Sequence, residues 1–162
     1  MAKAREIPGL SGDDSYATAA VTVVEVRAQE LAGQSAGVLD VGDIERVHDM
    51  RVASRRLRAA LEVFEPCFPR KQFRDTLDEV KDLADALGER RDRDVAIAAL
   101  EQFSAALPAP DRPGVNSLIA RLREEQAAAN EALSSFVSRE HLEVLTEKLV
   151  GLAAEARPEA MR

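Results

Sequence analysis

The sequence has few of the residues that build disulfides, aromatic cores or membrane spans. Its 162 residues include one cysteine, no tryptophan and one tyrosine. A single cysteine excludes an intrachain disulfide and fits a reducing compartment. No apolar run approaches the roughly 20 residues that a transmembrane helix needs, and the N-terminus lacks the apolar stretch of a signal peptide. We therefore expect a cytoplasmic protein whose core is built from Ala, Leu and Val.

Charge is abundant but unevenly placed. Charged residues make up 31 % of the chain and apolar residues 46 %, a balance typical of a folded domain. The net charge is −7, but residues 46–93 hold 12 basic and 10 acidic residues, while the remainder holds 10 basic and 19 acidic residues. Because the distribution of charge matters more than its sum, a basic site within an acidic protein is compatible with this composition.

Hydrophobic spacing predicts an all-α fold, an antiparallel bundle of about five to six helices. Pro66 and Gly88 are expected to end helices, and Asp43 to cap one. Asp92 or Asp94 is expected to cap the fourth helix. The predicted helices span about 14–31, 46–64, 70–87, 93–106, 115–137 and 139–156. The predicted organisation is a flexible leader (1–13), a helical bundle (14–157) and a tail (158–162).

The second predicted helix has two contrasting faces. An α-helix turns about 100° per residue, so His48 and three arginines fall within roughly 80° of one another. The arginines are Arg51, Arg55 and Arg58. The apolar residues lie on the opposite face: Met50, Ala53, Leu57, Leu61 and Phe64. Arg56 falls on a flank. The helix is therefore expected to bury one face and to present a row of cations on the other.

Two interpretations of this cationic face follow from the pattern alone. The arginines could be a solvated surface, or could pair with acidic residues of the next helix, namely Asp75, Asp78, Asp82 and Asp85. Alternatively, a row of phosphates could satisfy them, because a guanidinium group matches phosphate oxygens in a bidentate way. Glu62 is the only nearby carboxylate on the same face, so the helix does not neutralise its own charge.

Two motifs in order resemble the signatures of the CHAD family, the conserved histidine α-helical domain. The first is His48-x-x-Arg51-Val52-Ala53-x-Arg55-Arg56-Leu57-Arg58. The second is Lys81-x-Leu83-Ala84-x-Ala86-Leu87-Gly88-x-x-Arg91-Asp92-x-Asp94-Val95. The resemblance covers about residues 14–155. It implies an all-helical fold and binding of inorganic polyphosphate, with association with polyphosphate granules.

Carried over by position, the resemblance implies a basic site without a metal, a cofactor or catalytic residues. The matching residues are His48, Arg51, Arg55, Arg56, Arg58, Lys81 and Arg91. Asp92 and Asp94 suit a different role, either in capping the fourth helix or in orienting Arg91. The sequence shows no glycine-rich phosphate loop and no Cys/His cluster at metal spacing, so we expect a binding protein and not an enzyme.

The sequence departs from the family pattern in one respect. The usual domain has two similar helical halves, each with its own histidine–arginine signature, whereas this chain matches only the first. His141 is followed by Leu142-Glu143-Val144 and does not begin a second signature. A homodimer could supply the missing half by two-fold symmetry.

Other functions remain open at this point. A nucleic-acid-binding helical module is one alternative, although the arginine face has few amide side chains for base reading and no interleaved aromatic residue for stacking. A structural or adaptor bundle is another. A phosphatase acting through a phosphorylated His48 is the least supported.

Overall fold

The computed structural model describes residues 3–157 and contains five α-helices in that range. They are α1 (Tyr16–Gly33), α2 (Ile44–Val63), α3 (Arg70–Ala106), α4 (Arg112–Phe136) and α5 (Arg139–Ala154). Two short 3-10 turns, η1 (Glu65–Cys67) and η2 (Ala109–Asp111), precede α3 and α4. The described residues contain no strand, which confirms the predicted all-α class. The predicted tail, residues 158–162, lies outside the described residues.

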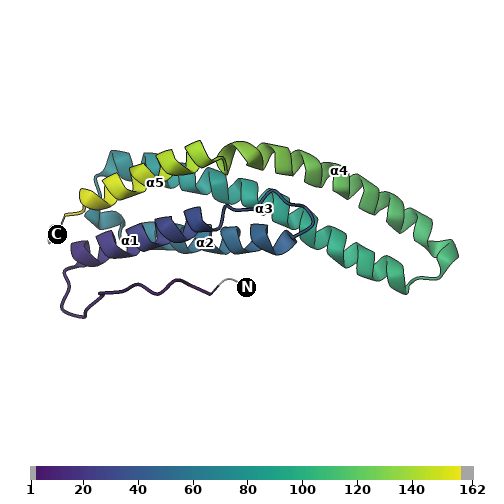
Figure 1. The fold of residues 1–162 in the computed structure, drawn as a ribbon, viewed down its shortest axis with the longest axis horizontal. Coiled ribbons are helices and arrows are strands. Elements are labelled where there is room, and N and C mark those ends of the chain that lie inside the picture. The colour runs from purple at the N-terminus through teal and green to yellow at the C-terminus, as the bar shows by residue number, and fades with distance from the viewer. Residues whose placement is uncertain (1–2, 158–162) are drawn as a thin grey trace.

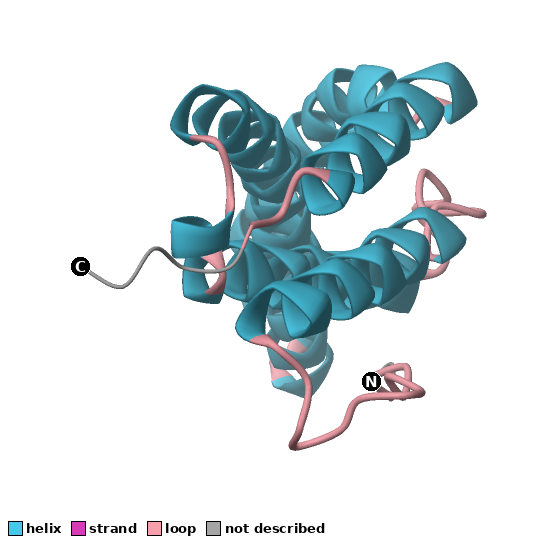
Figure 2. Ribbon diagram, turned by 90° about the vertical axis from the view of Figure 1, so that its left-hand side faces the viewer, coloured by secondary structure: helices cyan, strands magenta, loops and turns pink. Residues whose placement is uncertain are grey.

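The helices form a four-helix bundle with a hairpin extending from one end (Figure 1). α1 packs against α2 and α5, and α2 packs against α3. The second part of α3 pairs with α4, and these two helices extend together beyond the other three. Figure 2 views the molecule from the end opposite the hairpin. The line along which α2 and α3 pack together, here called the α2–α3 seam, has exposed side chains on both helices, among them Arg55 and Asp85.

The predicted inner face of the second helix is confirmed. All five of the apolar side chains expected there are buried: Met50, Ala53, Leu57, Leu61 and Phe64. They join one hydrophobic cluster with residues of α1, α3 and α5. Because spacing of three and four residues keeps apolar groups on one side of a helix, burial of this stripe directs the opposite face of α2 outward.

The prediction that Gly88 ends a helix is wrong. α3 continues without interruption through Gly88, so the expected helices 70–87 and 93–106 are one element of 37 residues. A glycine inside a helix costs about 1 kcal/mol relative to alanine. Buried positions continue at helical spacing on both sides of it, at Leu83, Leu87, Arg90, Asp94 and Ile97. Packing along this face outweighs the low helix propensity of glycine. Because α3 is continuous, neither Asp92 nor Asp94 begins a helix.

Two other expected boundaries differ in detail. Asp43 occupies the N-cap position of α2, but its side chain accepts a hydrogen bond from Arg46 Nε at 2.9 Å and caps no backbone N–H. The segment between the predicted helices 93–106 and 115–137 contains η2, and Pro113 lies in the first turn of α4, where the missing N–H of proline is tolerated. None of the helices in the described range is long and apolar enough to span a membrane.

Candidate functional site

The outer faces of α2 and α3 meet along a seam at the point where the two sequence motifs lie side by side. The chain reverses direction between the two helices at residues 64–69, so they run antiparallel. Gly88 lies beneath Arg51, because a Cβ built on Gly88 would be 3.8 Å from Arg51 Nε. Further along the seam, Asp85 of α3 contributes to the electrostatic environment of Arg58 of α2. The fold thus brings the second motif, on α3, into contact with the first motif, on α2.

Three of the seven predicted site residues have no polar partner in the described part of the chain. The side chains of His48, Arg51 and Arg55 make no ion pair or hydrogen bond there. His48 and Arg51 are half-buried, and Arg55 is exposed. A partly buried guanidinium group loses hydration, and an unpaired one has no counter-charge to replace it. These three residues are the part of the face that no described protein group pairs with.

Arg58 and Lys81 are paired, but only with exposed carboxylates. Arg58 Nε lies 2.8 Å from Glu62 Oε1, and this hydrogen bond raises the pKa of the guanidinium group. Lys81 Nζ lies 3.7 Å from Asp78 Oδ1. Exposed pairs of this kind contribute about 0–1 kcal/mol, so a polyanion can compete for both cations.

Arg56 belongs to a partly buried ion pair with a residue of α1. Its Nη1 lies 2.8 Å from Glu30 Oε1 of α1, and the Glu30 side chain is only 5 % exposed. Glu30 Oε2 accepts a second hydrogen bond from Arg27 at 2.5 Å. The backbone N–H of Arg5 donates to Glu30 Oε1 at 3.3 Å, which fastens the N-terminal segment to α1. Arg56 thus has a structural partner that the sequence motif did not reveal.

Glu30 is held in its charged form by these neighbours. Burial by itself raises the pKa of a carboxyl group, but three groups act in the opposite direction. Arg27, the Arg5 backbone and Arg56 together lower the pKa of Glu30 below its ordinary value. The Glu30 carboxylate therefore remains available as the partner of Arg56 near neutral pH.

Arg91 is also engaged within the protein. Its Nη1 donates to the carbonyl oxygen of Ile44, in the first turn of α2, at 2.9 Å, and Glu45 Oε1 lies 3.4 Å from its Nη2. The Arg91 side chain is 17 % exposed. This contact holds the beginning of α2 against α3, immediately before His48 and Arg51.

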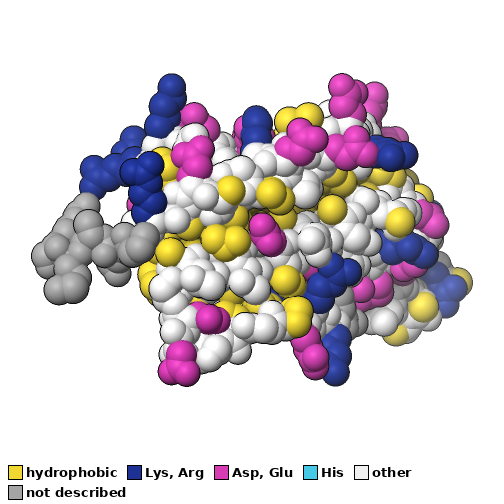
Figure 3. Space-filling view, turned by 60° about the vertical axis from the view of Figure 1, so that its left-hand side comes forward, with side chains coloured by type: hydrophobic (Ala, Val, Ile, Leu, Met, Phe, Trp, Pro, Cys, Tyr) yellow, Lys and Arg dark blue, Asp and Glu magenta, His cyan; other side chains and the backbone are white. Residues whose placement is uncertain are grey.

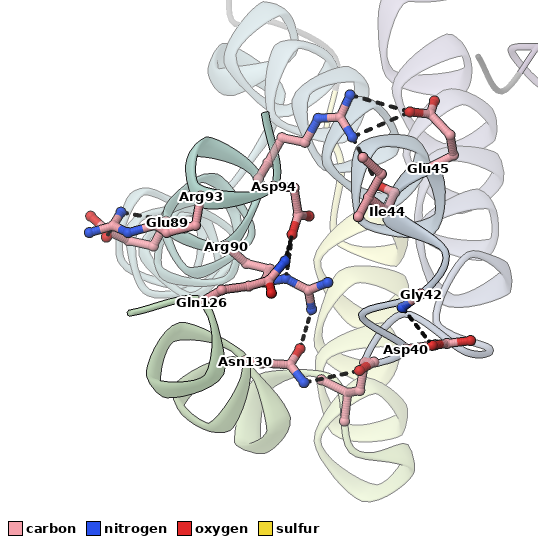
Figure 4. A network of polar contacts seen from close by, with 12 residues as sticks. Asp40, Gly42, Ile44, Glu45, Glu89, Arg90, Arg93, Asp94, Gln126 and Asn130 are labelled. Atoms are coloured by element: carbon pink, nitrogen blue, oxygen red, sulfur yellow. Dashed lines mark hydrogen bonds and ion pairs between the residues drawn. The ribbon is translucent and has the colours of Figure 1, made fainter. Parts of the chain in front are cut away.

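Next to Arg91, a buried polar network joins α3, α4 and the loop before α2 (Figure 4). Arg90 Nε donates to Asp94 Oδ1 at 2.9 Å, and both side chains are fully buried. Arg90 Nη1 also donates to Asn130 of α4, whose Nδ2 donates to the Leu39 carbonyl at 3.0 Å. The expectation that Asp94 caps a helix or orients Arg91 is therefore wrong: Asp94 pairs with Arg90, which faces the interior.

The acidic residues of α3 form no ion pair with an arginine of α2 in the described part of the chain. Of the four candidates, Asp78 pairs with Lys81 of its own helix, and Asp85 contributes only a weaker electrostatic effect at Arg58. Asp75 and Asp82 form no ion pair in the range that the structure covers. The described residues also contain no group of three or more His, Cys, Asp or Glu side chains that could hold a metal ion.

Comparison with known proteins gives the class of this fold. A family model described as CHAD domain matches residues 22–162. Among solved structures, the CHAD domain from the plant Ricinus communis is similar, with a TM-score of 0.67 and 24 % sequence identity over 96 % of this chain. The match covers 52 % of the Ricinus chain, so this chain spans about half its length. No curated protein is similar enough in sequence to be matched to the chain.

The chain belongs to the CHAD family, as the two motifs indicated. The residues that carried the resemblance fall into two groups in the structure. His48, Arg51, Arg55, Arg58 and Lys81 are unpaired or weakly paired along the seam, whereas Arg56 and Arg91 are tied to α1 and to the start of α2.

Proposed function

We propose that this protein binds inorganic polyphosphate, without catalysis, along the outer α2–α3 seam. The observation that carries the proposal is the half-buried Arg51, which lies over Gly88 with no counter-charge in the described structure. His48 and Arg55 share its face and also lack partners there. Arg58 and Lys81 extend the row, because their carboxylate partners are exposed and weakly held.

A linear polyanion suits this row better than a single phosphate does. Guanidinium groups one helical turn apart repel one another, and an anion with regularly repeated charge can neutralise several of them at once. Binding then releases counterions from the polyanion, so affinity falls steeply as salt rises. Membership of the CHAD family supports the same ligand.

In this proposal Arg56 and Arg91 are positioning residues and do not contact the anion. Arg56 fixes the side of α2 that faces α1, and Arg91 fixes the beginning of α2. Together they set the rotation of α2, and so the direction in which Arg51 and Arg55 point.

The test is a titration of the protein with long-chain polyphosphate, orthophosphate and duplex DNA at two salt concentrations. We expect tight, salt-sensitive binding of polyphosphate, weak binding of orthophosphate and weaker binding of DNA. The double variant Arg51→Glu/Arg55→Glu should lose polyphosphate binding while keeping its helix content.

The matched control is Arg121→Glu/Arg139→Glu, which changes the net charge equally at exposed arginines of α4 and α5. Unchanged polyphosphate binding in the seam variant would place the site elsewhere. Equal affinity of the parent for DNA would favour a nucleic-acid-binding module. No anion binding at all would favour a structural or adaptor bundle.

Assembly and location belong to the same proposal. We propose a homodimer in which a second copy supplies the half that the Ricinus chain has and this chain does not match. A mass near 17.6 kDa by light scattering, with and without polyphosphate, would exclude the dimer. A cytoplasmic protein associated with polyphosphate granules fits this function, and fluorescence microscopy of a tagged chain would test it.

A further inference from the structure

A second group of cations lies at the end of α3 that is remote from the hairpin. Arg70, Lys71 and Arg74 are all exposed, and none has a polar side-chain partner among the described residues. Arg157 is brought to the same end, because its backbone N–H donates to the Cys67 carbonyl at 2.9 Å. Figure 3 shows several Lys and Arg side chains gathered at one end of the molecule, at the left of the view.

Two of these arginines continue the line of the seam. At about 100° per residue, Arg70, Arg74 and Lys81 fall within roughly 40° of one another on α3, in the direction of Gly88. At about 1.5 Å per residue, Arg74 lies about 6 Å beyond Arg70, and Lys81 about 10 Å beyond Arg74. α3 is one continuous helix over this range, so the alignment is retained.

The acidic residues of α3 lie to one side of this line. By the same helical geometry they are turned from Lys81 by increasing angles: about 40° for Asp85, 60° for Asp78, 100° for Asp82 and 120° for Asp75. Asp78 is the nearest interruption, 3.7 Å from Lys81 Nζ, and its side chain is 71 % exposed. Such a solvated carboxylate holds Lys81 only weakly. A polyanion that continues beyond Lys81 therefore passes one solvated carboxylate, Asp78, before it reaches Arg74 and Arg70.

We propose that Arg74 and Arg70 form an extension of the polyphosphate site that only chains longer than the α2 row can reach. The inference rests on the proposed function and adds a selectivity for chain length. A short polyphosphate fills the row of His48, Arg51 and Arg55, while a longer one continues past Arg58 and Lys81 onto the first turns of α3. Each added contact releases further counterions, so the longer chain binds more tightly and with a steeper dependence on salt.

The experiment compares long-chain polyphosphate with tripolyphosphate on the parent and on Arg70→Gln/Arg74→Gln. Glutamine keeps the helix propensity close to that of arginine and removes the charge. We expect the variant to bind the long chain roughly tenfold more weakly at low salt, with its salt slope reduced by about 0.7 for each lost cation. Tripolyphosphate binding should change less than about twofold, since its charges stay on the α2 row.

The matched control is Arg121→Gln/Arg139→Gln, which removes two positive charges from α4 and α5. If the control weakens long-chain binding as much as the α3 variant does, the effect is one of net charge and the extension is wrong. Equal loss for both ligands, or no loss for either, also overturns it. A parent that binds neither ligand overturns the proposed function and the extension together, so the two failures are distinguishable.

Discussion

Arg56 Nη1 of α2 lies 2.8 Å from Glu30 Oε1 of α1, while the adjacent Arg55 points to solvent with no partner in the described structure. Two neighbouring arginines of one motif therefore have different roles. About 100° of helical rotation separates them, enough to turn one toward α1 and the other away from it.

The adjacent residues Arg55 and Arg56 allow a direct comparison of effects on stability and on polyphosphate binding. We expect Arg56→Gln to lower the free energy of unfolding by about 1–3 kcal/mol, because it removes a charged hydrogen bond to a buried carboxylate. Its polyphosphate affinity should fall only indirectly, with the salt slope of the parent, because no phosphate contact is lost. Arg55→Gln should show the opposite, with unchanged stability, weaker binding and a reduced salt slope. Urea unfolding and a polyphosphate titration of both variants measure this; the reverse assignment of effects would contradict the structure.

The same carboxylate should make stability depend on pH. The pKa of Glu30 is lowered in the folded protein, so its contribution is present above the pKa of the unfolded chain. That contribution is lost as the pH falls through the lower, folded-state pKa. We expect the free energy of unfolding to decrease across this acidic range, and to decrease less in Glu30→Gln. Urea unfolding at a series of acidic pH values tests the difference, and parallel curves for parent and variant would contradict it.

Gly88 offers a test of the space beneath Arg51. A Cβ at this position would meet Arg51 Nε at 3.8 Å, an ordinary contact, so Gly88→Ala should fit. We expect it to raise the free energy of unfolding by up to about 1 kcal/mol, the helix-interior difference between the two residues, and to retain binding. Gly88→Glu should abolish most binding by placing a carboxylate beside Arg51. Thermal unfolding and titration check both, and undiminished binding by the glutamate variant would mean that Arg51 is not a ligand.

Arg91 should act on binding indirectly. Arg91→Gln removes the hydrogen bond to the Ile44 carbonyl, and we expect a loss of stability of about 1–2 kcal/mol. Polyphosphate affinity should fall, but the salt slope should stay that of the parent because no phosphate contact is lost. Arg51→Gln, the comparison variant, should reduce the slope. A reduced slope in Arg91→Gln would make Arg91 a ligand.

The stability of the protein should be sensitive to a substitution of either Arg90 or Asp94 alone, because the two form a buried ion pair. Asp94→Asn or Arg90→Met leaves a buried polar or charged group without its partner, and we expect a loss of about 3–5 kcal/mol. The double variant Arg90→Met/Asp94→Leu should recover much of this loss, since no buried charge remains. The free energies of unfolding of the three variants, measured with denaturant, test this expectation. Additive losses in the double variant would show that the two residues act independently.

Much of the fold follows from local pattern. The apolar residues of α2 recur at three and four, and all of those expected inside are buried, because an amphipathic helix has only one way to bury its stripe. The error at Gly88 has a physical cause as well. A glycine disfavours a helix by an amount that is small beside the burial of Leu83, Leu87 and Ile97 along the same face.

The candidate site was predictable only in part. Its cationic face could be placed by angle, since His48, Arg51 and Arg55 share a side of one helix. The sequence could not show which of the cations already have a partner within the protein. Glu30 lies 26 residues from Arg56, and the Ile44 carbonyl lies 47 residues from Arg91. Arg70, Arg74 and Lys81 all lie within the predicted helix 70–87, so their alignment follows from residue spacing, and the structure adds that the three side chains have at most one weak, exposed partner.

The sequence by itself determined that α2 has a core face and a cationic face, because helical periodicity is a property of residue spacing alone. Only the tertiary structure decided that Arg56 and Arg91 are tied within the protein while Arg51 and Arg55 are not. The physical reason is that a counter-charge is supplied by whichever helix packs alongside, and packing, not spacing, brings α1 to one flank of α2 and α3 to the other.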